Sequence, residues 1–424
     1  MNRVRPLAVV AGLAVAFGAC DEQLNGGIAC PALCPAPPSS LRDTTLFAVN
    51  LDTSIAGFPA FGNEFQFLLV SFGDTLETGA AIRFDSLPRT WQRSNASDDS
   101  SIVFIDTGSY LRLTILTGDT IGLATTIEVY DVDLSGDEEA DPLAVAAAFT
   151  PARLLGSRTV PADSLRDSVR VPIDPVFLLS KVQDTFPANR LRLGIRVQQG
   201  GNPRLKVVST NSGGAAQLVF RPSPDTAVAV PTLRIEPFSR TPADPFLAND
   251  LADYLVVLKG PPPPPPDVVR VGGLPARRAY LRFDIPANIL DSSNVVRATL
   301  FLTQRPNGLS AEPDDTVGLG HFGVVSGSSI TDITRALFFL QRLTNRDTLR
   351  ALPTDSGAHA FEMIDWVRAW RGTDPLKTPR AMGLASATEG EKPGYLDFFA
   401  IEAGAAERPR LRLTYIPRAA GPLP

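Results

Sequence analysis

The sequence has few of the residues that most enzymatic sites use. Its 424 residues include only two histidines and three cysteines. We find no Gly-x-Ser-x-Gly elbow, no His-Glu-x-x-His helix and no phosphate-binding glycine loop. We therefore expect a protein that is not an enzyme. A polysaccharide-degrading enzyme stays open as an alternative, since glycosidase chemistry needs only two carboxylates at a suitable separation.

The chain also lacks a net positive charge and long apolar runs. The formal net charge is −5, so the chain has no positive field that would attract nucleic acid. A polytopic membrane protein is excluded because long apolar segments are missing. The 44% hydrophobic content, on the other hand, exceeds that of a disordered chain. At about 150 residues per domain, the length indicates a globular protein of two or three domains.

Residues 1–19 have the features of a targeting segment. Arg3 and Arg5 precede the apolar run Leu7–Ala19, which is too short to span a bilayer as a mature helix. The run ends in small residues followed by Cys20. This pattern resembles a bacterial lipoprotein signal peptide, which implies acylation of Cys20 and a membrane partner. The expected location is extracytoplasmic, on the outer membrane or cell surface. An ordinary secretory signal, with Cys20 incidental, is the alternative.

The segment after the signal, residues 20–43, is rich in Pro, Ala, Gly and Ser and has no hydrophobic periodicity. We interpret it as a tether between the anchor and the first domain. Cys30 and Cys34 lie in this tether and face an oxidising compartment, as a local disulfide or as free thiols.

Beyond the tether, short apolar or alternating runs separated by Gly, Pro, Asp and Asn are typical of all-β sandwiches. Four motifs also occur twice in the same order, which indicates an internal duplication. The matching segments are Ile82–Asp85 with Leu281–Asp284, Asp119–Leu123 with Asp315–Leu319, Ile173–Asp174 with Ile364–Asp365, and Pro231–Ile235 with Pro409–Leu413. We predict two tandem β-sandwich domains over 44–237 and 248–417, each with one or two short helices.

Six consecutive prolines, Pro261–Pro266, have two interpretations. Such a run is commonly a spacer between domains. However, Tyr254–Leu258 matches the region around Leu46–Val49 at the start of the first repeat. We therefore expect the prolines to form an extended loop between the first two strands of the second domain.

The second repeat also matches a family pattern. The segments concerned are Val268–Gly273, Arg278–Asp284, Arg297–Leu302, Asp365–Trp370 and Arg408–Tyr415. Together they resemble a DNRLRE domain over Ala252–Pro417. The resemblance implies a jelly-roll-like, extracytoplasmic β-sandwich of a kind that includes carbohydrate-binding modules. The sequence departs from the family at His321–Val325, where a tryptophan is usual.

The clearest local motif is an acidic loop. Carboxylate or hydroxyl oxygens alternate along it, with Gly136 at the sixth position, as in loops that bind calcium. The candidate metal ligands are Asp131, Asp133, Ser135, Asp137 and Glu139. Pro142 occupies the twelfth position, which excludes an EF-hand. The alternative is a solvated acidic turn that caps a helix starting near Asp141. Calcium is thus the one candidate cofactor.

Tryptophans are the remaining candidates. Trp91 lies in a polar stretch and could stack on a sugar ring, or equally close the edge of a sandwich. Trp366 and Trp370 are four residues apart, which places them on one helical face. We expect this second pair to plug the end of a sandwich rather than to bind sugar.

These features predict a lipid-anchored, non-enzymatic binding or scaffold protein outside the cytoplasm. Its candidate partners are the membrane, polysaccharide and surface proteins. A purely structural spacer is the first alternative, and the polysaccharide-degrading enzyme is the second.

Overall fold

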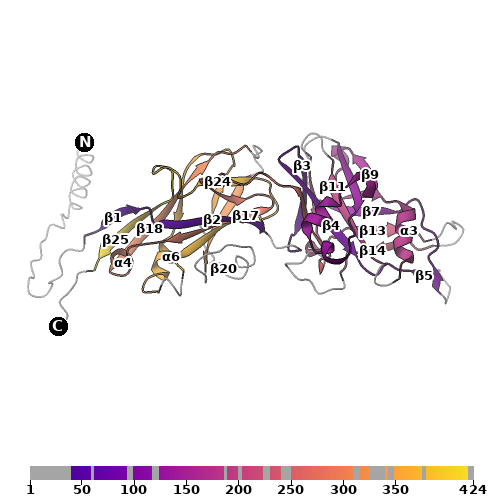
Figure 1. Ribbon diagram of the computed structural model, residues 1–424, viewed down its shortest axis with the longest axis horizontal. Helices are drawn as coiled ribbons and strands as arrows, with labels where there is room; N and C mark the ends of the chain where they lie inside the picture. The colour runs from indigo at the N-terminus through magenta and orange to yellow at the C-terminus, as the bar shows by residue number, and fades with distance from the viewer. Residues whose placement is uncertain are drawn as a thin grey trace, which may run out of the picture.

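The chain forms two antiparallel β-sandwiches (Figure 1). The computed structural model describes residues 40–58, 62–92, 99–116, 124–185, 189–198, 203–222, 230–239, 250–308, 316–324, 340–341, 348–374 and 379–418. The predicted signal peptide, Cys20, Cys30 and Cys34 lie outside these residues. Within them, no helix is both long and apolar enough to cross a membrane. The all-β prediction is confirmed.

The first sandwich extends from β3 to β15. Its elements are β3 (Gln66–Phe72), β4 (Leu76–Phe84), β5 (Thr90–Gln92), β6 (Asp99–Ser101), β7 (Tyr110–Leu116), β8 (Thr125–Asp131), η2 (Gly136–Glu139), α2 (Pro142–Ala147), η3 (Pro151–Arg153), β9 (Leu154–Val160), η4 (Ala162–Ser164), β10 (Ser168–Pro172), α3 (Pro175–Gln183), β11 (Leu191–Val197), β12 (Arg204–Val208), η5 (Thr210–Ser212), β13 (Gln217–Phe220), β14 (Leu233–Ile235) and β15 (Asp253–Lys259). The short pair β5–β6 forms a small sheet of its own.

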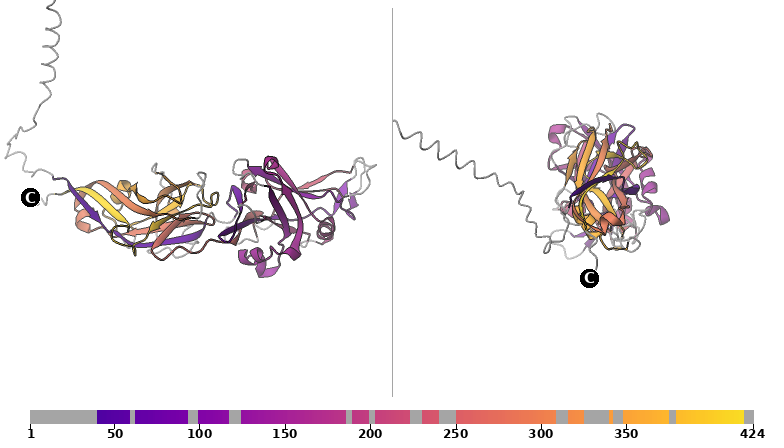
Figure 2. Two further views of the ribbon diagram at one scale, coloured as in Figure 1. Left: turned by 90° about the horizontal axis from the view of Figure 1, so that it is seen from above. Right: turned by 90° about the vertical axis from the view of Figure 1, so that its left-hand side faces the viewer.

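The second sandwich combines both ends of the described chain. Its elements are β1 (Arg42–Leu46), β2 (Val49–Phe58), β16 (Val268–Gly272), β17 (Ala276–Phe283), α4 (Ala287–Leu290), β18 (Ser293–Arg305), β19 (Val317–Val324), β20 (Leu340–Gln341), β21 (Leu349–Ala351), β22 (Gly357–Glu362), α6 (Ile364–Ala369), β23 (Ala381–Ser386), β24 (Tyr395–Phe399) and β25 (Arg410–Pro417). Figure 2 shows β1 and β2, in indigo, lying among the orange and yellow C-terminal strands.

The two sandwiches have the same strand order. The first follows β14-β13-β7-β12-β3-β4-β11-β8-β9, and the second follows β1-β25-β18-β24-β16-β17-β23-β19-β20. Each path turns at a hairpin held by few residue pairs: β3–β4 in the first sandwich and β16–β17 in the second. At this hairpin one layer of the sandwich passes into the other. The shared order confirms the predicted duplication.

The two repeats exchange their opening strands. β2 pairs with β17 of the second repeat, and β15 pairs with β4 of the first. Asp52 lies opposite Leu281, and Asp253 lies opposite Ile82. Because Ile82 and Leu281 match between the repeats, β2 and β15 occupy equivalent positions. Each strand therefore completes the sandwich of the other repeat.

This exchange alters the domain boundaries. The prediction assigned 44–237 to one domain and 248–417 to the other, whereas β1 and β2 belong to the second sandwich and β14 and β15 to the first. The match of Pro231–Ile235 with Pro409–Leu413 is displaced by one strand, because β14 takes the place of β1 and β13 that of β25. Strand pairing joins residues far apart in sequence, so local patterns do not reveal it.

The proline run has a different place from the one predicted. It follows β15 in the first sandwich and precedes β16 in the second, so it crosses between them. We predicted a loop within one domain; the structure makes the segment a connection between two. Proline fixes an extended backbone and acts as a semi-rigid spacer. Arg270 Nη1 donates to the carbonyl of Pro262 at 3.0 Å and holds the run against β16.

Leu274 joins the two sandwiches at the β16–β17 hairpin. Its side chain is fully buried within the hydrophobic cluster of the first sandwich. Tyr395 Oη donates to the Leu274 carbonyl at 2.7 Å. Gly273 has φ of +84°, and a Cβ there would overlap the Tyr395 ring. The turn therefore needs glycine to bring the tyrosine close enough to fix Leu274.

Trp366 in α6 and Trp370 directly after it lie in the core of the second sandwich, as predicted. Trp366 and Trp370 are 6% and 4% exposed. Trp366 Nε1 donates to His321 Nδ1 at 2.9 Å, so the buried indole N–H has a hydrogen-bond partner. The Trp370 ring lies 5.3 Å from that of Phe283, between ring centroids. Because both indoles are buried, neither presents a face to a ligand.

Glu64 contributes to holding the exchanged strand β15. Its Oε1 accepts a hydrogen bond from the backbone N–H of Leu255 at 3.2 Å. Burial, together with the nearby charge of Asp253, raises the pKa of Glu64 to about 7. Burial also raises the pKa of Asp253, although this carboxylate accepts two hydrogen bonds from Thr210. Burial raises the pKa of the neighbouring Tyr254 to about 12, and the charge of Glu64 adds a smaller increase.

The Glu64 pKa predicts a pH-dependent stability. The Glu64 carboxyl binds its proton more tightly in the folded state than in the unfolded chain. The resulting contribution to the free energy of unfolding is therefore fully present below pH 4.5 and is lost as pH rises through 7. We expect Glu64→Gln to remove this loss, which corresponds to roughly 3 kcal/mol from the pKa difference. Urea unfolding at pH 5 and pH 8 measures it. The exposed Glu138→Gln is the control, and an unchanged pH slope in Glu64→Gln would contradict the assignment.

Candidate functional site

The acidic loop 131–141 connects the inner strand β8 to α2. β8 ends at Asp131, and Gly136 adopts φ of +66° at the start of η2. Asp141 then caps α2, because its Oδ1 accepts the backbone N–H of Leu143 at 2.9 Å. The capping role that the sequence suggested as an alternative is therefore present.

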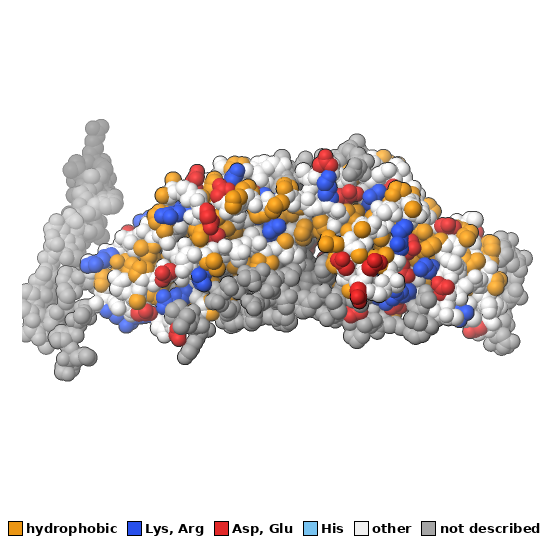
Figure 3. Space-filling model, viewed as in Figure 1, with side chains coloured by type: hydrophobic (Ala, Val, Ile, Leu, Met, Phe, Trp, Pro, Cys, Tyr) orange, Lys and Arg blue, Asp and Glu red, His pale blue; other side chains and the backbone are white. Residues whose placement is uncertain are grey.

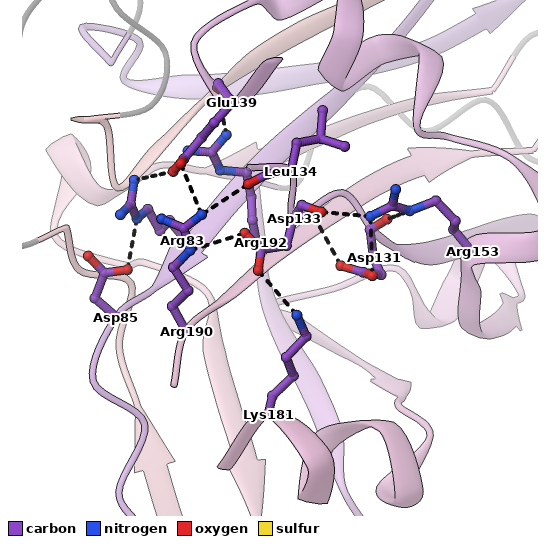
Figure 4. Close-up of polar contacts among 10 residues, drawn as sticks. All are labelled: Arg83, Asp85, Asp131, Asp133, Leu134, Glu139, Arg153, Lys181, Arg190 and Arg192. Carbon is purple, nitrogen blue, oxygen red and sulfur yellow. Dashed lines mark hydrogen bonds and ion pairs between the residues drawn. The ribbon is translucent and has the colours of Figure 1, made fainter. Parts of the chain in front are cut away.

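Glu139 is the centre of the polar contacts in Figure 4. Its Oε1 accepts from Arg83 Nη1 at 2.8 Å and from Arg192 Nη2 at 3.2 Å. Its Oε2 accepts from Arg190 Nη2 at 2.9 Å. Arg192 is 1% exposed, and burial lowers its pKa. Three guanidinium groups, from β4, β11 and the residue before β11, thus compensate one buried carboxylate.

The earlier part of the loop is held by a second set of cations. Arg153 donates to the Asp131 carbonyl at 2.6 Å and to Asp131 Oδ2 at 3.2 Å. Lys181 Nζ lies 3.2 Å from Asp133 Oδ2, and Arg190 Nε lies 3.4 Å from Asp133 Oδ1. Together with Glu139 and its partners, these residues form what we call the loop network. It joins β4, β8, β11, η2, η3 and α3.

The loop network does not fit a calcium ion. Calcium requires six to eight oxygen ligands that converge on one point. Here the carboxylates of Asp131, Asp133 and Glu139 are directed at guanidinium and ammonium groups, while Ser135 and Asp137 are exposed to solvent. Among the described residues no group of three or more His, Cys, Asp or Glu could hold a metal. The structure thus places the five predicted ligands along one loop but does not bring them together as a cage.

An open pocket of about 670 Å³ lies beside the loop network. Side chains of both charge signs line it, among them Lys181, Arg153, Glu138 and Asp184. Most of its charged groups already have partners within the protein. The lining therefore offers no concentrated charge of one sign to attract a small ion.

Trp91 is not the exposed sugar platform that we considered. It lies in β5, is 7% exposed, and packs into the hydrophobic cluster of the first sandwich. Closing the edge of the sandwich is the role that fits. All three tryptophans of the chain are thus buried, and stacking on a sugar ring needs an exposed aromatic face.

The two histidines have structural partners. His321 is buried and accepts from Trp366, as described above. His359 Nε2 lies 2.8 Å from Gln304 Oε1, and burial lowers the pKa of this histidine. Neither is arranged with a nucleophile among these contacts.

Sequence reasoning did not identify the basic side of the loop network. Arg83 belongs to the repeated motif Ile82–Asp85, and Arg192 alternates with apolar residues along β11. From the sequence alone, the alternating pattern predicts that these arginines lie on the exposed face of a half-buried strand. A charge at an alternate strand position gives no indication of whether a second layer or a loop covers it.

Comparisons with known proteins give no relative from which to transfer a function. No family model matches the chain, and no curated protein matches it. Among solved structures, a structure of the infectious bursal disease virus Gx strain is 13% identical, with a TM-score of 0.13, covering 91% of this chain and 78% of that chain. A second structure, of the T13 particle of the same virus, is 10% identical with a TM-score of 0.12, covering 89% and 74%. Such low TM-scores carry no argument about this protein.

The loop network predicts a large cost for removing its central charge. We expect Glu139→Gln to destabilise the first sandwich by about 3 kcal/mol, because buried guanidinium groups are left without their carboxylate. Thermal or urea unfolding would measure the loss. Glu138→Gln, one residue earlier and exposed, should change stability by less than about 0.5 kcal/mol. Equal effects of the two substitutions would contradict the burial of this charge.

The same geometry predicts that calcium does not change the stability of the protein. We expect equal melting temperatures in millimolar calcium and in chelator, because binding to the folded state alone would raise the melting temperature. Differential scanning calorimetry of the chain from Asp21 onward measures this. A rise with calcium that disappears in Asp137→Asn would show that the loop rearranges to form a site.

Proposed function

We propose that this protein is a lipid-anchored scaffold outside the cytoplasm. It carries the first sandwich at a distance from the membrane. The anchor is Cys20, and the tether, predicted over residues 20–43, ends two residues earlier, at Leu41, because β1 begins at Arg42. The likeness of residues 1–20 to lipoprotein signals and of the second repeat to DNRLRE domains supports this location.

The observation that carries the proposal is the arrangement of the two sandwiches. They lie end to end, with β1 and β25 at the outer end of the second sandwich and β5 and α3 at the opposite end of the molecule (Figures 1 and 2). Because β1 follows the tether, an anchor at Cys20 puts the second sandwich next to the membrane. The first sandwich then faces outward.

The joint between the sandwiches supports a spacing role. Two covalent crossings connect them, one from β2 to β3 and one along Pro261–Pro266. The buried Leu274 adds a packed contact at the same joint. A body with two crossings and a buried contact holds its length better than one with a single flexible linker.

The described surface favours a scaffold over a sugar-binding module. Figure 3 shows positive and negative side chains interspersed over both sandwiches on the face in view. The tryptophans are buried, and most of the charged side chains that line the pocket beside the loop network are paired with one another. We therefore do not propose a glycan ligand.

The proposal predicts a position-dependent distance from the membrane. A fluorophore on Thr45→Cys, at the anchored end, should be quenched by acceptor lipids in vesicles that hold the lipidated protein. The same fluorophore on Ser100→Cys, in β6 at the far end, should be quenched much less. Cys30 and Cys34 are replaced by Ser in both variants so that each carries one label.

The matched control is Cys20→Ser, which should leave both labels unquenched because the chain no longer floats with the vesicles. Equal quenching at the two positions would overturn the spacing role. Vesicle flotation by the Cys20→Ser variant would overturn the anchor.

A further inference from the structure

We propose that the end of the second sandwich that follows the tether binds the surface of an anionic membrane. This surface combines arginines with exposed aliphatic side chains, and we call it the basic end. Its residues are Leu41, Arg42, Val296, Arg368, Arg371 and Arg418. Its partner is the layer of negatively charged headgroups of a lipid bilayer. The inference deepens the proposed function and rests on the membrane location given there.

Two of the arginines come from α6. Arg368 lies in its last turn, and Arg371 lies two residues beyond its end. Their Nη2 atoms donate to the backbone carbonyls of Val295 and Asp291, each at 3.4 Å. Segment 291–295 spans the junction of α4 and β18. The end of α6 therefore places both side chains beside this junction.

The other two arginines come from the ends of the described chain. The backbone N–H of Arg418, after β25, donates to the carbonyl of Ser292 at 3.0 Å. Arg42 begins β1 and lies opposite Tyr415 of β25, which in turn lies opposite Val295 of β18. All four arginines thus surround the same short segment, at the end of the molecule where Figure 1 shows β1, β25 and α4.

The charge of these arginines is not neutralised within the protein. None of the four guanidinium groups forms an ion pair with a carboxylate in the part of the chain that the structure describes. The nearby Arg297 and Arg412, by contrast, are paired with Glu362 at 3.7 Å and with Asp43 at 3.5 Å. Three of the four arginines are exposed and Arg371 is half-buried, so an external anion can approach them.

Carboxylates are fewer than arginines around this segment. Asp291 Oδ1 accepts the backbone N–H of Gly372 at 2.9 Å, and Asp365 lies in the first turn of α6. Positive charge is therefore in excess at this end, although the whole chain has a net charge of −5. Such an excess is attracted to the negative surface of a membrane, where each arginine raises the affinity about fivefold.

Two exposed aliphatic side chains accompany the arginines. Leu41 and Val296 are 60% and 45% exposed. Both line one hollow of about 340 Å³, together with Arg297 and Arg412 among others, so they are not isolated from each other. Amphipathic surfaces that lie in the headgroup region of a bilayer combine the same two kinds of side chain.

The place of the basic end in the chain favours a membrane as its partner. Leu41 is the last residue before β1, so this is the described surface next to the tether. Residues 21–41 can span roughly 70 Å when fully extended, so the tether alone does not hold the sandwich on the bilayer. Binding of the basic end supplies a second attachment, and a lipid chain combined with a basic patch is held more firmly than the lipid alone.

Vesicle cosedimentation tests this surface. The unlipidated chain from Asp21 onward is mixed with vesicles of phosphatidylcholine, with or without phosphatidylglycerol. We expect binding only to the vesicles that contain phosphatidylglycerol, and its loss as salt screens the charges. Arg42→Gln combined with Arg418→Gln should weaken this binding about thirtyfold. Neither side chain makes a hydrogen bond within the described residues, so the double variant should keep the fold.

The matched control is Arg89→Gln combined with Arg166→Gln. These exposed arginines lie on the first sandwich, so the control removes the same charge elsewhere and should bind like the unchanged chain. Equal weakening by both double variants would overturn the basic end, as would the absence of binding to phosphatidylglycerol. Glycerol phosphate at the phosphate concentration of the vesicles should not displace the chain. Displacement would identify a soluble anion as the ligand and overturn the membrane surface.

An environment-sensitive fluorophore gives a second readout. It is placed on Asn294→Cys, exposed in β18 at the basic end, or on Ser100→Cys in β6, with Cys30 and Cys34 replaced by Ser. Vesicles with phosphatidylglycerol should shift the emission to shorter wavelength at position 294 and leave it unchanged at position 100. A shift at position 100 alone, or at neither position, would overturn the assignment.

The anchor is tested apart from this surface by using vesicles of phosphatidylcholine alone, which carry no net charge. The lipidated chain should float with them, and the unlipidated chain should not. Failure of the basic end to bind phosphatidylglycerol therefore leaves the anchor standing. Failure of the lipidated chain to float with neutral vesicles overturns the anchor and leaves this binding standing.

Discussion

Backbone pairing between strands that the chain order keeps apart holds the whole arrangement together. β2 binds along β17 and β15 binds along β4, so that each repeat is closed by a strand from the other. The sheet edge that each strand covers would otherwise present unpaired N–H and C=O groups to solvent. The end-to-end arrangement of the sandwiches, the two crossings between them and the position of the proline run all follow from this pairing.

The same exchange explains where the joint is reinforced. The first residues of β15 are held by buried polar contacts, from Leu255 to Glu64 and from Thr210 to Asp253. On the other side, Leu274 packs into the first sandwich from the β16–β17 hairpin. Leu274 thus ties the second sandwich to the core of the first, while the polar contacts fix the strand that leads to the proline run.

The loop network shows how a motif with the composition of a metal site serves a structural role. Its acidic residues lie at alternate positions of the loop that follows β8. In the fold, arginines of β4 and β11 and cations from η3 and α3 face the same turn. A cation cluster and an acidic loop neutralise each other, and the oxygens that a metal would need are already engaged.

The sequence by itself determined the strand content, the duplication and the burial of Trp366 and Trp370, because these depend on local alternation and helical spacing. It also identified the acidic loop. Only the tertiary structure decided which body each opening strand completes, because strand pairing is a long-range contact that a local pattern does not encode. The same reason applies to Trp91 and Arg192, whose neighbours come from other layers. Whether such a side chain is exposed, buried in a core or paired with a charge depends on which other segments of the chain pack against its strand.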